Sequence, residues 1–172
     1  DITINIQTGT VTELYGGLEE GRFDVCFGTK NPKYDFKWLA LGQDRFYAIL
    51  PKDYPTDDNE FKISGFNGTK FLMPGLGFDD DIGAVFNDYN IKPFVTPTYV
   101  DDPAIISMVE HGLGISMLSE LIIAGRTDSV KVLPIVPEVC RTLALATKQD
   151  KVMTLPMKRL VAITKEFAKT MQ

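Results

Sequence analysis

The stretch ITINIQTGTVTELYGGLEEGRFDVCF, residues 2–27, predicts one β–α–β unit. Its first six residues, 2–7, alternate apolar and polar side chains, which is typical of a strand with one buried face. Thr10-Val11-Thr12-Glu13 forms a capping box that predicts the start of a helix, and Gly21 predicts its end. Residues 23–27 are apolar enough for a parallel strand that helices cover on both faces.

Strand and helix patterns continue along the rest of the chain. Apolar segments predict strands at residues 36–41, 46–50, 69–73, 94–100, 114–117, 130–135 and 142–147. Amphipathic segments predict helices at residues 82–89, 103–112, 118–124 and 156–169. Pro97 marks residues 94–100 as an edge strand, because proline has no backbone N–H to donate. Asp102 is the expected N-cap of the helix that Gly112 ends.

The alternation of strands and helices predicts an α/β fold of two Rossmann-like subdomains with mostly parallel sheets. The first subdomain is expected to begin with residues 1–50, the second to comprise residues 51–146, and the first to resume at residues 147–172. The polar segment 52–60, which contains Pro55, is the expected linker. In the closing helix, Leu160, Ile163 and Phe167 are expected to face inward. Ligands of such folds bind beyond the carboxyl ends of strands, so we expect a site in the cleft between the subdomains.

The composition excludes several classes of protein. The 172 residues carry 18 Lys and Arg against 23 Asp and Glu, a net charge of −5, so no net field attracts nucleic acid to this chain alone. No segment approaches the roughly 20 uninterrupted apolar residues of a membrane span. Cys26 and Cys140 adjoin apolar residues and are expected to be buried free thiols in a reducing compartment. Because the chain starts at Asp1 without a methionine or a signal peptide, we expect a piece of a larger, cytoplasmic protein.

Residues that could catalyse a reaction or hold a cofactor are few. His111 lies at a predicted helix end, where a cation is favourable without a catalytic role, and Ser116 lacks the flanking glycines of a nucleophile elbow. The glycine pairs within residues 75–77 and 112–114 lack the third glycine of a dinucleotide motif. The acidic residues 79–81 could bind a cation, but complementing the start of the next helix explains them better. We therefore expect no catalytic residue, metal or cofactor.

Small and hydroxylated residues precede three predicted helices, in Thr8-Gly9-Thr10, Pro74-Gly75-Leu76-Gly77 and Val100-Asp101-Asp102. Free backbone amides at such positions suit a carboxylate or another small anion. The alternative is that these residues are only caps and turns, which every α/β fold has.

Three segments of the chain carry a family pattern. The first combines Gly9-Thr10-Val11-Thr12-Glu13-Leu14 with Leu18-Glu19-Glu20-Gly21-Arg22-Phe23-Asp24-Val25-Cys26-Phe27. The second is Leu50-Pro51-Lys52-Asp53-Tyr54-Pro55, with tyrosine where histidine is common. The third is Met108-Val109-Glu110-His111-Gly112-Leu113-Gly114-Ile115-Ser116-Met117-Leu118-Ser119, with its last serine in place of the usual proline. Together, over essentially the whole chain, they resemble the effector-binding domain of LysR-type transcriptional regulators.

The resemblance implies a periplasmic-binding-protein type II-like fold, hinged by crossing segments near residues 48–52 and 142–147. In the family, a strand and a helix precede the segment that matches residues 2–7, so the first subdomain is expected to lack its first strand and helix here. A winged helix-turn-helix and a linker helix are expected before Asp1. Residues 2–7 and 94–100 resemble the elements that family dimers pair head-to-tail.

The same resemblance implies which residues contact an effector. On the two walls and the floor of the cleft they are Gly9, Thr10, Pro74, Gly75, Phe78, Asp101 and Ile115. A carboxylate at Asp101 disfavours an anionic effector unless it is turned away.

The expected function is ligand sensing without a reaction. A small polar or anionic effector binds in the cleft, shifts the arrangement of subdomains or dimers, and thereby repositions DNA-binding domains that are tethered to this one. The expected partners are this effector and further copies of the chain in a homodimer or homotetramer, with DNA bound only by the absent N-terminal domain. Because a fold does not fix function, two alternatives remain: a solute-binding protein of a transporter, and a fold-related enzyme such as prephenate dehydratase.

Overall fold

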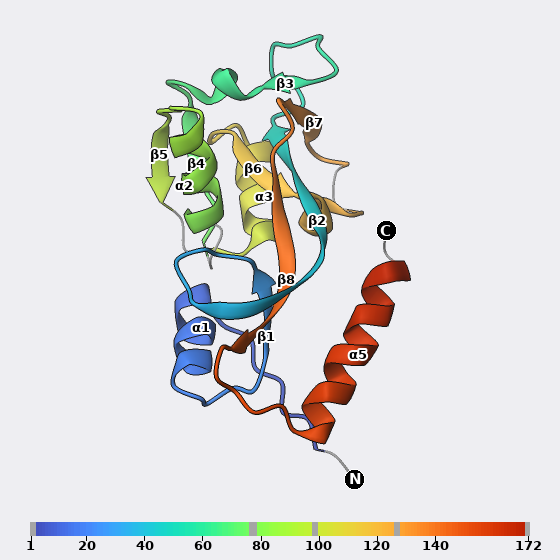
Figure 1. Cartoon of the computed structure of the whole chain (residues 1–172). Helices are drawn as coiled ribbons and strands as arrows, with labels where there is room; N and C mark the ends of the chain where they lie inside the picture. Colours follow the sequence, from blue (N-terminus) through green and yellow to red (C-terminus); the bar gives the residue numbers. More distant parts are fainter. Residues whose placement is uncertain (1–2, 76–78, 98–99, 126–127, 171–172) are drawn as a thin grey trace. The chain divides into compact units, whose positions relative to one another are not determined.

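The computed structural model describes residues 3–75, 79–97, 100–125 and 128–170 (Figure 1). In chain order the elements are α1 (Val11–Glu19), β1 (Cys26–Thr29), β2 (Phe36–Leu50), β3 (Phe61–Lys62), the 3₁₀ helix η1 (Ile63–Phe66), β4 (Lys70–Met73), α2 (Asp79–Asp88), β5 (Phe94–Pro97), α3 (Asp102–Glu110), β6 (Ser116–Ser119), α4 (Glu120–Ile123), β7 (Lys131–Val136), β8 (Cys140–Lys148) and α5 (Leu155–Thr170). None of the helices in the described residues is long and apolar enough to cross a membrane.

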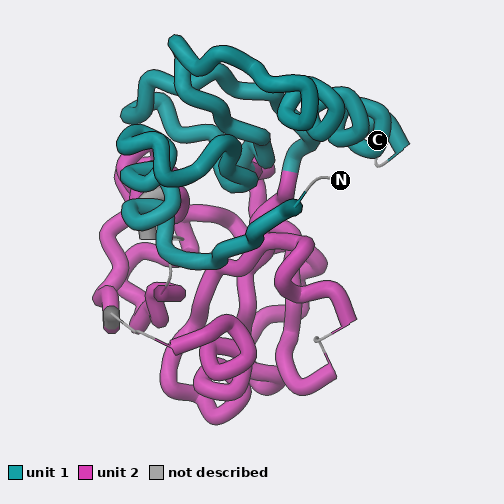
Figure 2. Tube along the Cα trace, turned by 90° about the horizontal axis from the view of Figure 1, so that it is seen from below, with its two compact units in different colours: residues 1–43, 141–172 teal, residues 44–140 magenta. Residues whose placement is uncertain are grey.

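The chain divides into two compact units. Unit 1 consists of Asp1–Gln43 and Arg141–Gln172, and unit 2 of Asp44–Cys140 (Figure 2). The chain passes from one unit to the other within β2 and returns within β8. The subdomain limits predicted from the sequence, after residues 50 and 146, lie at the end of β2 and inside β8.

In unit 1, α1 packs on β1 through Tyr15 and Leu18. Both side chains are fully buried, in a cluster that includes Cys26 of β1 and Phe36 of β2. The Tyr15 hydroxyl donates a hydrogen bond of 2.6 Å to the carbonyl of Thr29, which joins the helix to the end of the strand. The predicted helix end is confirmed, because Gly21 takes a positive φ of 78° that side chains with a Cβ rarely adopt.

The prediction of a parallel strand at residues 23–27 is wrong in direction and shifted in position. β1 runs antiparallel to β8, with Cys26 opposite Ala146 and Thr29 opposite Leu143. Phe27 is 52% exposed, so one face of the strand is open. A short apolar segment does not reveal its direction, because direction is set by a partner strand near the other end of the chain.

The predicted strand at residues 2–7 does not form. Residues 3–10 have no regular secondary structure, and Ile4 and Ile6 are 68% and 87% exposed. An alternating segment becomes a strand only where a neighbour supplies backbone partners, and no described strand pairs with this one. The predicted β–α–β unit is therefore wrong.

β2 is one strand of 15 residues where two were predicted. Its polar middle has partners next to β8: Gln43 Nε2 lies 3.2 Å from Thr142 Oγ1, and Arg45 Nη2 lies 3.1 Å from Glu138 Oε2. Polar residues that have such partners do not require a turn, so the chain stays extended.

The segment 52–60 is not a linker between the units. It lies wholly within unit 2, and Lys131 Nζ donates to the carbonyls of Tyr54 and Thr56 at 3.1 Å and 3.0 Å. Its polar composition reflects a surface loop that is anchored by its backbone.

Unit 2 contains two sets of paired strands. β2 pairs antiparallel with β6 and with β7, β7 pairs parallel with β3, and β4 pairs parallel with β5. On β4, Phe71 also forms an isolated parallel β-bridge with Ile115. Phe66, Phe71 and Phe86 are buried with ring centroids 4.9–5.8 Å apart, which packs α2 against β4.

The inward face of α5 differs from the prediction. Leu160 is half-buried, but Ile163 and Phe167 are 55% and 64% exposed, and Met157 and Ala168 are buried instead. The two sets lie on neighbouring stripes of one helix. The apolar periodicity alone does not tell which stripe faces the unit.

We expect Gly114→Ala to lower the free energy of unfolding by about 2 kcal/mol, because its Cβ cannot fit without a backbone shift. That atom would lie 2.6 Å from the carbonyl oxygen of Lys70. The matched control is Gly83→Ala in α2, where a Cβ meets nothing within 4 Å. Gly83→Ala should raise the free energy of unfolding by roughly 0.5–1 kcal/mol, because alanine favours a helix more than glycine does. Urea unfolding of both variants measures the difference, and equal effects would contradict the close approach.

Candidate functional site

Unit 1 places the predicted site residues Gly9 and Thr10 at the start of α1. The Thr10 N–H donates to Glu13 Oε2 at 2.8 Å, and the Glu13 N–H donates to Thr10 Oγ1 at 3.3 Å. The Thr10 hydroxyl itself donates to Glu13 Oε2 at 2.9 Å. The predicted capping box is therefore confirmed, and the Thr10 hydroxyl is engaged by the chain's own carboxylate.

Sequence reasoning did not include Glu13 among the residues of this candidate site. The backbone N–H of Thr10, and after it the Thr10 hydroxyl, hold the pKa of the exposed Glu13 carboxyl below its usual range. Its carboxylate therefore occupies the place at the helix start that a bound anion would take. The capping-box spacing itself was the signal, since the box requires an acceptor at this position.

Unit 2 brings two loops to one edge of a parallel strand pair. In the register of β4 and β5, Met73 lies opposite Pro97, so both strands end at the same level. Pro74 and Gly75 follow β4, and α2 begins at Asp79. The predicted site residue Phe78 lies outside the described residues. Parallel strands followed by helices form the usual ligand-binding edge of α/β folds.

Asp101 lies at the start of α3, beyond β5. Its backbone is extended, and its Oδ1 accepts a hydrogen bond of 3.0 Å from the N–H of Ala104. Asp101, rather than the predicted Asp102, is therefore the N-cap. Two adjacent aspartates compete for this role, and the backbone at residue 101 decides between them. This helix start also carries a carboxylate of the chain.

Ile115 supports this edge through its backbone. Its N–H donates to the carbonyl of Lys70 and its carbonyl accepts from the N–H of Leu72, both at 2.9 Å. Its side chain is buried in the core of unit 2. A role of Ile115 in contacting an effector stays a prediction, as do the roles of the other six predicted residues.

His111 ends α3. Its Nδ1 lies 2.8 Å from the carbonyl oxygen of Ser107, one turn earlier. This contact favours the interpretation of His111 as a helix-end residue. Among the residues that the structure describes, no group of three or more His, Cys, Asp or Glu side chains could hold a metal ion.

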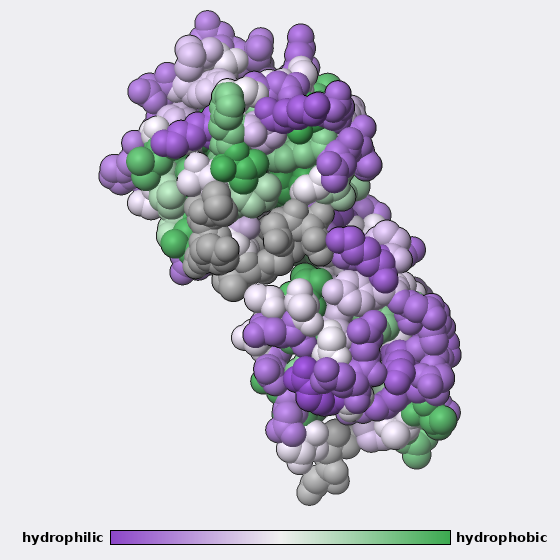
Figure 3. All heavy atoms as spheres, turned by 90° about the vertical axis from the view of Figure 1, so that its left-hand side faces the viewer, coloured by the Kyte–Doolittle hydropathy of each residue, from purple (hydrophilic) through white to green (hydrophobic). Residues whose placement is uncertain are grey.

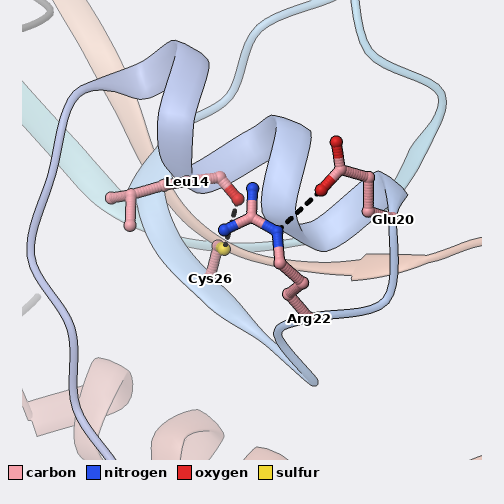
Figure 4. Close-up of polar contacts among 4 residues, drawn as sticks. All are labelled: Leu14, Glu20, Arg22 and Cys26. Atoms are coloured by element: carbon pink, nitrogen blue, oxygen red, sulfur yellow. Dashed lines mark hydrogen bonds and ion pairs between the residues drawn. The ribbon is translucent and has the colours of Figure 1, made fainter.

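The two cysteines, Cys26 and Cys140, differ in their exposure to solvent. Cys26 is buried and its thiol donates to the carbonyl of Leu14 at 3.4 Å (Figure 4), and burial raises the pKa of this thiol. Just beyond the C-terminal end of α1, the exposed Arg22 Nε donates to Glu20 Oε2 at 2.6 Å (Figure 4). Cys140 is exposed, contrary to the prediction, because the first residue of β8 meets solvent.

Comparison with known proteins finds a consistent set of relatives. The family model for the LysR substrate binding domain matches residues 1–169. The transcriptional regulator YybE of Bacillus subtilis (strain 168), an uncharacterized protein of the HTH type, is 23% identical over 133 residues, which are 75% of this chain and 46% of the regulator. The chain thus spans about half the length of this relative.

Two solved structures show the same fold. The CcmR regulatory domain of Synechocystis PCC6803, in complex with 2-PG, has a TM-score of 0.85 at 17% identity, over 99% of this chain and 85% of that one. The effector-binding domain of QuiR, in complex with shikimate, has a TM-score of 0.81 at 18% identity, over 94% of this chain and 79% of that one. The predicted α/β fold of the periplasmic-binding-protein type II kind is confirmed.

We expect Thr10→Val to lower the free energy of unfolding by about 1 kcal/mol, the usual loss for an N-cap. Thr10→Ser keeps the hydroxyl and should leave stability unchanged. Because the folded pKa of Glu13 is lowered, its contribution is present at higher pH and is lost as the pH falls below about 4.5. Urea unfolding between pH 3 and pH 7 should show this loss in the wild type and a weaker one in Thr10→Val. The same pH dependence in both would contradict the capping role.

Proposed function

The chain belongs to the LysR substrate-binding domain family, and on this basis we propose that it is the ligand-sensing regulatory domain of a LysR-type transcriptional regulator. The observation that carries the proposal is the shared end of β4 and β5, from which two loops lead to the starts of α2 and α3. Such an edge binds a ligand without requiring a nucleophile or a metal. The domain binds and signals, and performs no reaction.

The proposed effector is a small polar molecule with an anionic group. Backbone N–H groups at helix starts favour anions, and the start of α1 already holds the carboxylate of Glu13. An effector carboxylate replaces Glu13 on the N–H and hydroxyl of Thr10. Gly9 leaves room there, since a Cβ at this position would lie 3.0 Å from Glu13 Oε2. Pro74, Gly75 and Phe78, in the sequence of unit 2, are the further residues that we propose for contacts with an effector.

The signal goes to DNA through another part of the protein. The chain spans about half the length of its regulator relatives, and we place a winged helix-turn-helix in the remainder. The effector shifts the regulator between two arrangements only if it binds them with different affinity, and this difference is the coupling free energy. The role places the protein in the cytoplasm with its target DNA.

A ligand panel tests the effector proposal. Shikimate, 2-PG, benzoate, succinate and inorganic phosphate are titrated into the chain while the unfolding temperature is monitored. A ligand at about 100 times its Kd adds roughly 2.7 kcal/mol, which raises the unfolding temperature by about 5–10 °C. No shift with any carboxylate would contradict the anionic effector.

Asp101→Asn distinguishes a charge effect from a structural one. Asparagine caps a helix as well as aspartate, so stability should be unchanged. Removal of one negative charge near the effector should lower the Kd of the best carboxylate by roughly two- to fivefold. Glu110→Gln removes the same charge at the far end of α3 and should leave the Kd unchanged. Equal calorimetric Kd values for Asp101→Asn and the wild type would place the effector elsewhere.

The proposed domain forms a homodimer, and dimers can pair into a homotetramer. Phe94 and Val95 are 73% and 46% exposed on β5, whose outer edge has no strand beside it in the described residues. Figure 3 shows apolar side chains gathered on the face that carries β5. Ile4 and Ile6, in the extended segment before α1, supply a matching apolar row. When this segment pairs with β5 of a second copy, the exposed apolar side chains of both elements are covered. The two-fold symmetry of the dimer repeats the contact.

Phe94→Glu should convert this dimer to a monomer, because it places a charge in an apolar contact. Ile6→Glu should have the same effect, since the two elements pair with each other. Leu113→Glu is the control, at another exposed apolar position of unit 2. Size-exclusion chromatography with light scattering measures the masses. A dimer that persists in Phe94→Glu would contradict the pairing.

A further inference from the structure

The turn between η1 and β4, within unit 2, contains Asn67-Gly68, the one place in the sequence where glycine follows asparagine. Asn67 has φ −60° and ψ 130°, and Gly68 has φ 66°, which agree with the two central residues of a type II turn. The Thr69 N–H closes the turn by donating to the carbonyl of Phe66 at 3.2 Å. Asn67 and Gly68 are both exposed, so water reaches them.

Asparagine followed by glycine converts itself slowly in water. The backbone nitrogen of Gly68 gives up its proton and bonds to Cγ of Asn67, while the bond from Cγ to the side-chain nitrogen breaks and ammonia leaves. Water then opens the resulting succinimide ring at either carbonyl, which leaves aspartate or isoaspartate. Glycine has no side chain that hinders this attack. The required groups therefore all lie in this one turn.

Two backbone contacts of Lys92 oppose this reaction in the folded chain. The Lys92 N–H donates to Asn67 Oδ1 at 2.8 Å, which holds the side-chain amide toward residue 92. The Gly68 N–H donates to the Lys92 carbonyl at 3.1 Å, so the attacking nitrogen is engaged. Attack needs a free Gly68 nitrogen and rotation of the Asn67 side chain, so both hydrogen bonds must break first. The reaction therefore depends on opening of this turn.

We propose that Asn67-Gly68 is a self-modification site, which pairing with Lys92 keeps inactive and which forms isoaspartate when the turn opens. It lies at the amino end of β4 and β5, the strands whose other end leads to the proposed effector loops. Isoaspartate routes the backbone through the former side chain, so the two contacts with Lys92 cannot both be kept. Conversion therefore adds a negative charge and loosens the start of the strand pair. The site uses none of the residues assigned to the effector.

Comparison of the folded and the unfolded chain tests the site. Both are incubated at mildly alkaline pH, without and with denaturing guanidinium chloride. Peptide mass spectrometry detects the change from amide to carboxylate, and chromatography against synthetic peptides identifies isoaspartate. The folded chain should react at least about tenfold more slowly, because two hydrogen bonds must break first. Equal rates, or no isoaspartate from the unfolded chain, would overturn the proposal.

A pair of variants isolates the contact with the Asn67 side chain. Lys92→Pro removes the N–H of residue 92 and keeps its carbonyl, whereas the matched control Lys92→Ala removes only the ammonium group. Folded Lys92→Pro should react roughly fivefold faster than folded Lys92→Ala, and the two should react equally when unfolded. Circular dichroism checks the fold of both variants. Equal rates in the folded state would overturn the role assigned to Lys92.

Hydrogen exchange of the wild-type chain provides a test that needs no substitution. The Gly68 N–H should be protected, and dilute guanidinium chloride that raises its exchange should raise the rate of isoaspartate formation in the same proportion. A rate that does not follow this exchange would overturn the dependence on opening. The purified isoaspartate form should also unfold at a lower temperature than Asn67→Asp, which has the same charge and an ordinary backbone. Equal unfolding temperatures would overturn the loosening of the strand pair.

Discussion

The candidate site in unit 2 depends on two backbone hydrogen bonds between β4 and the segment at Ile115. The Ile115 N–H donates to Lys70, and the Leu72 N–H donates to Ile115, both at 2.9 Å. Gly114 permits this approach because it has no Cβ. With one side of β4 held in this way and β5 paired on the other, the strand ends are level. The starts of α2 and α3 then follow from the lengths of two loops.

Carboxylates of the chain itself occupy the starts of α1 and α3. Glu13 neutralises the start of α1 and Asp101 that of α3. An anionic ligand at either place therefore exchanges with an internal acid instead of filling an empty anion site. Because the ligand must displace this carboxylate, its affinity is lower than free backbone amides alone would give. The exchange also links ligand binding to the release of a local contact, which is how binding can favour one of two arrangements.

Sequence reasoning succeeded where structure is set locally. The Thr10–Glu13 box and the helix end at Gly21 depend on neighbours within four residues, and both are observed. It failed where a distant partner decides. The strand at residues 2–7 needs a neighbour, the direction of β1 is set by β8, and the buried stripe of α5 is chosen by packing against its unit. The site residues were assigned through family resemblance, and the capping box was interpreted only as a helix start, although it also puts the Glu13 carboxylate where an anion would bind.

The contrast between the two cysteines makes the chain chemically addressable at one place. A thiol-reactive dye attacks the thiolate, so the buried Cys26, with its raised pKa, reacts slowly, whereas Cys140 is open to reagent. Cys140 is the last residue of unit 2, immediately before Arg141 of unit 1. A fluorophore can therefore be attached to the natural sequence at the crossing point of the chain, where its emission would report any change in the strand that links the two units.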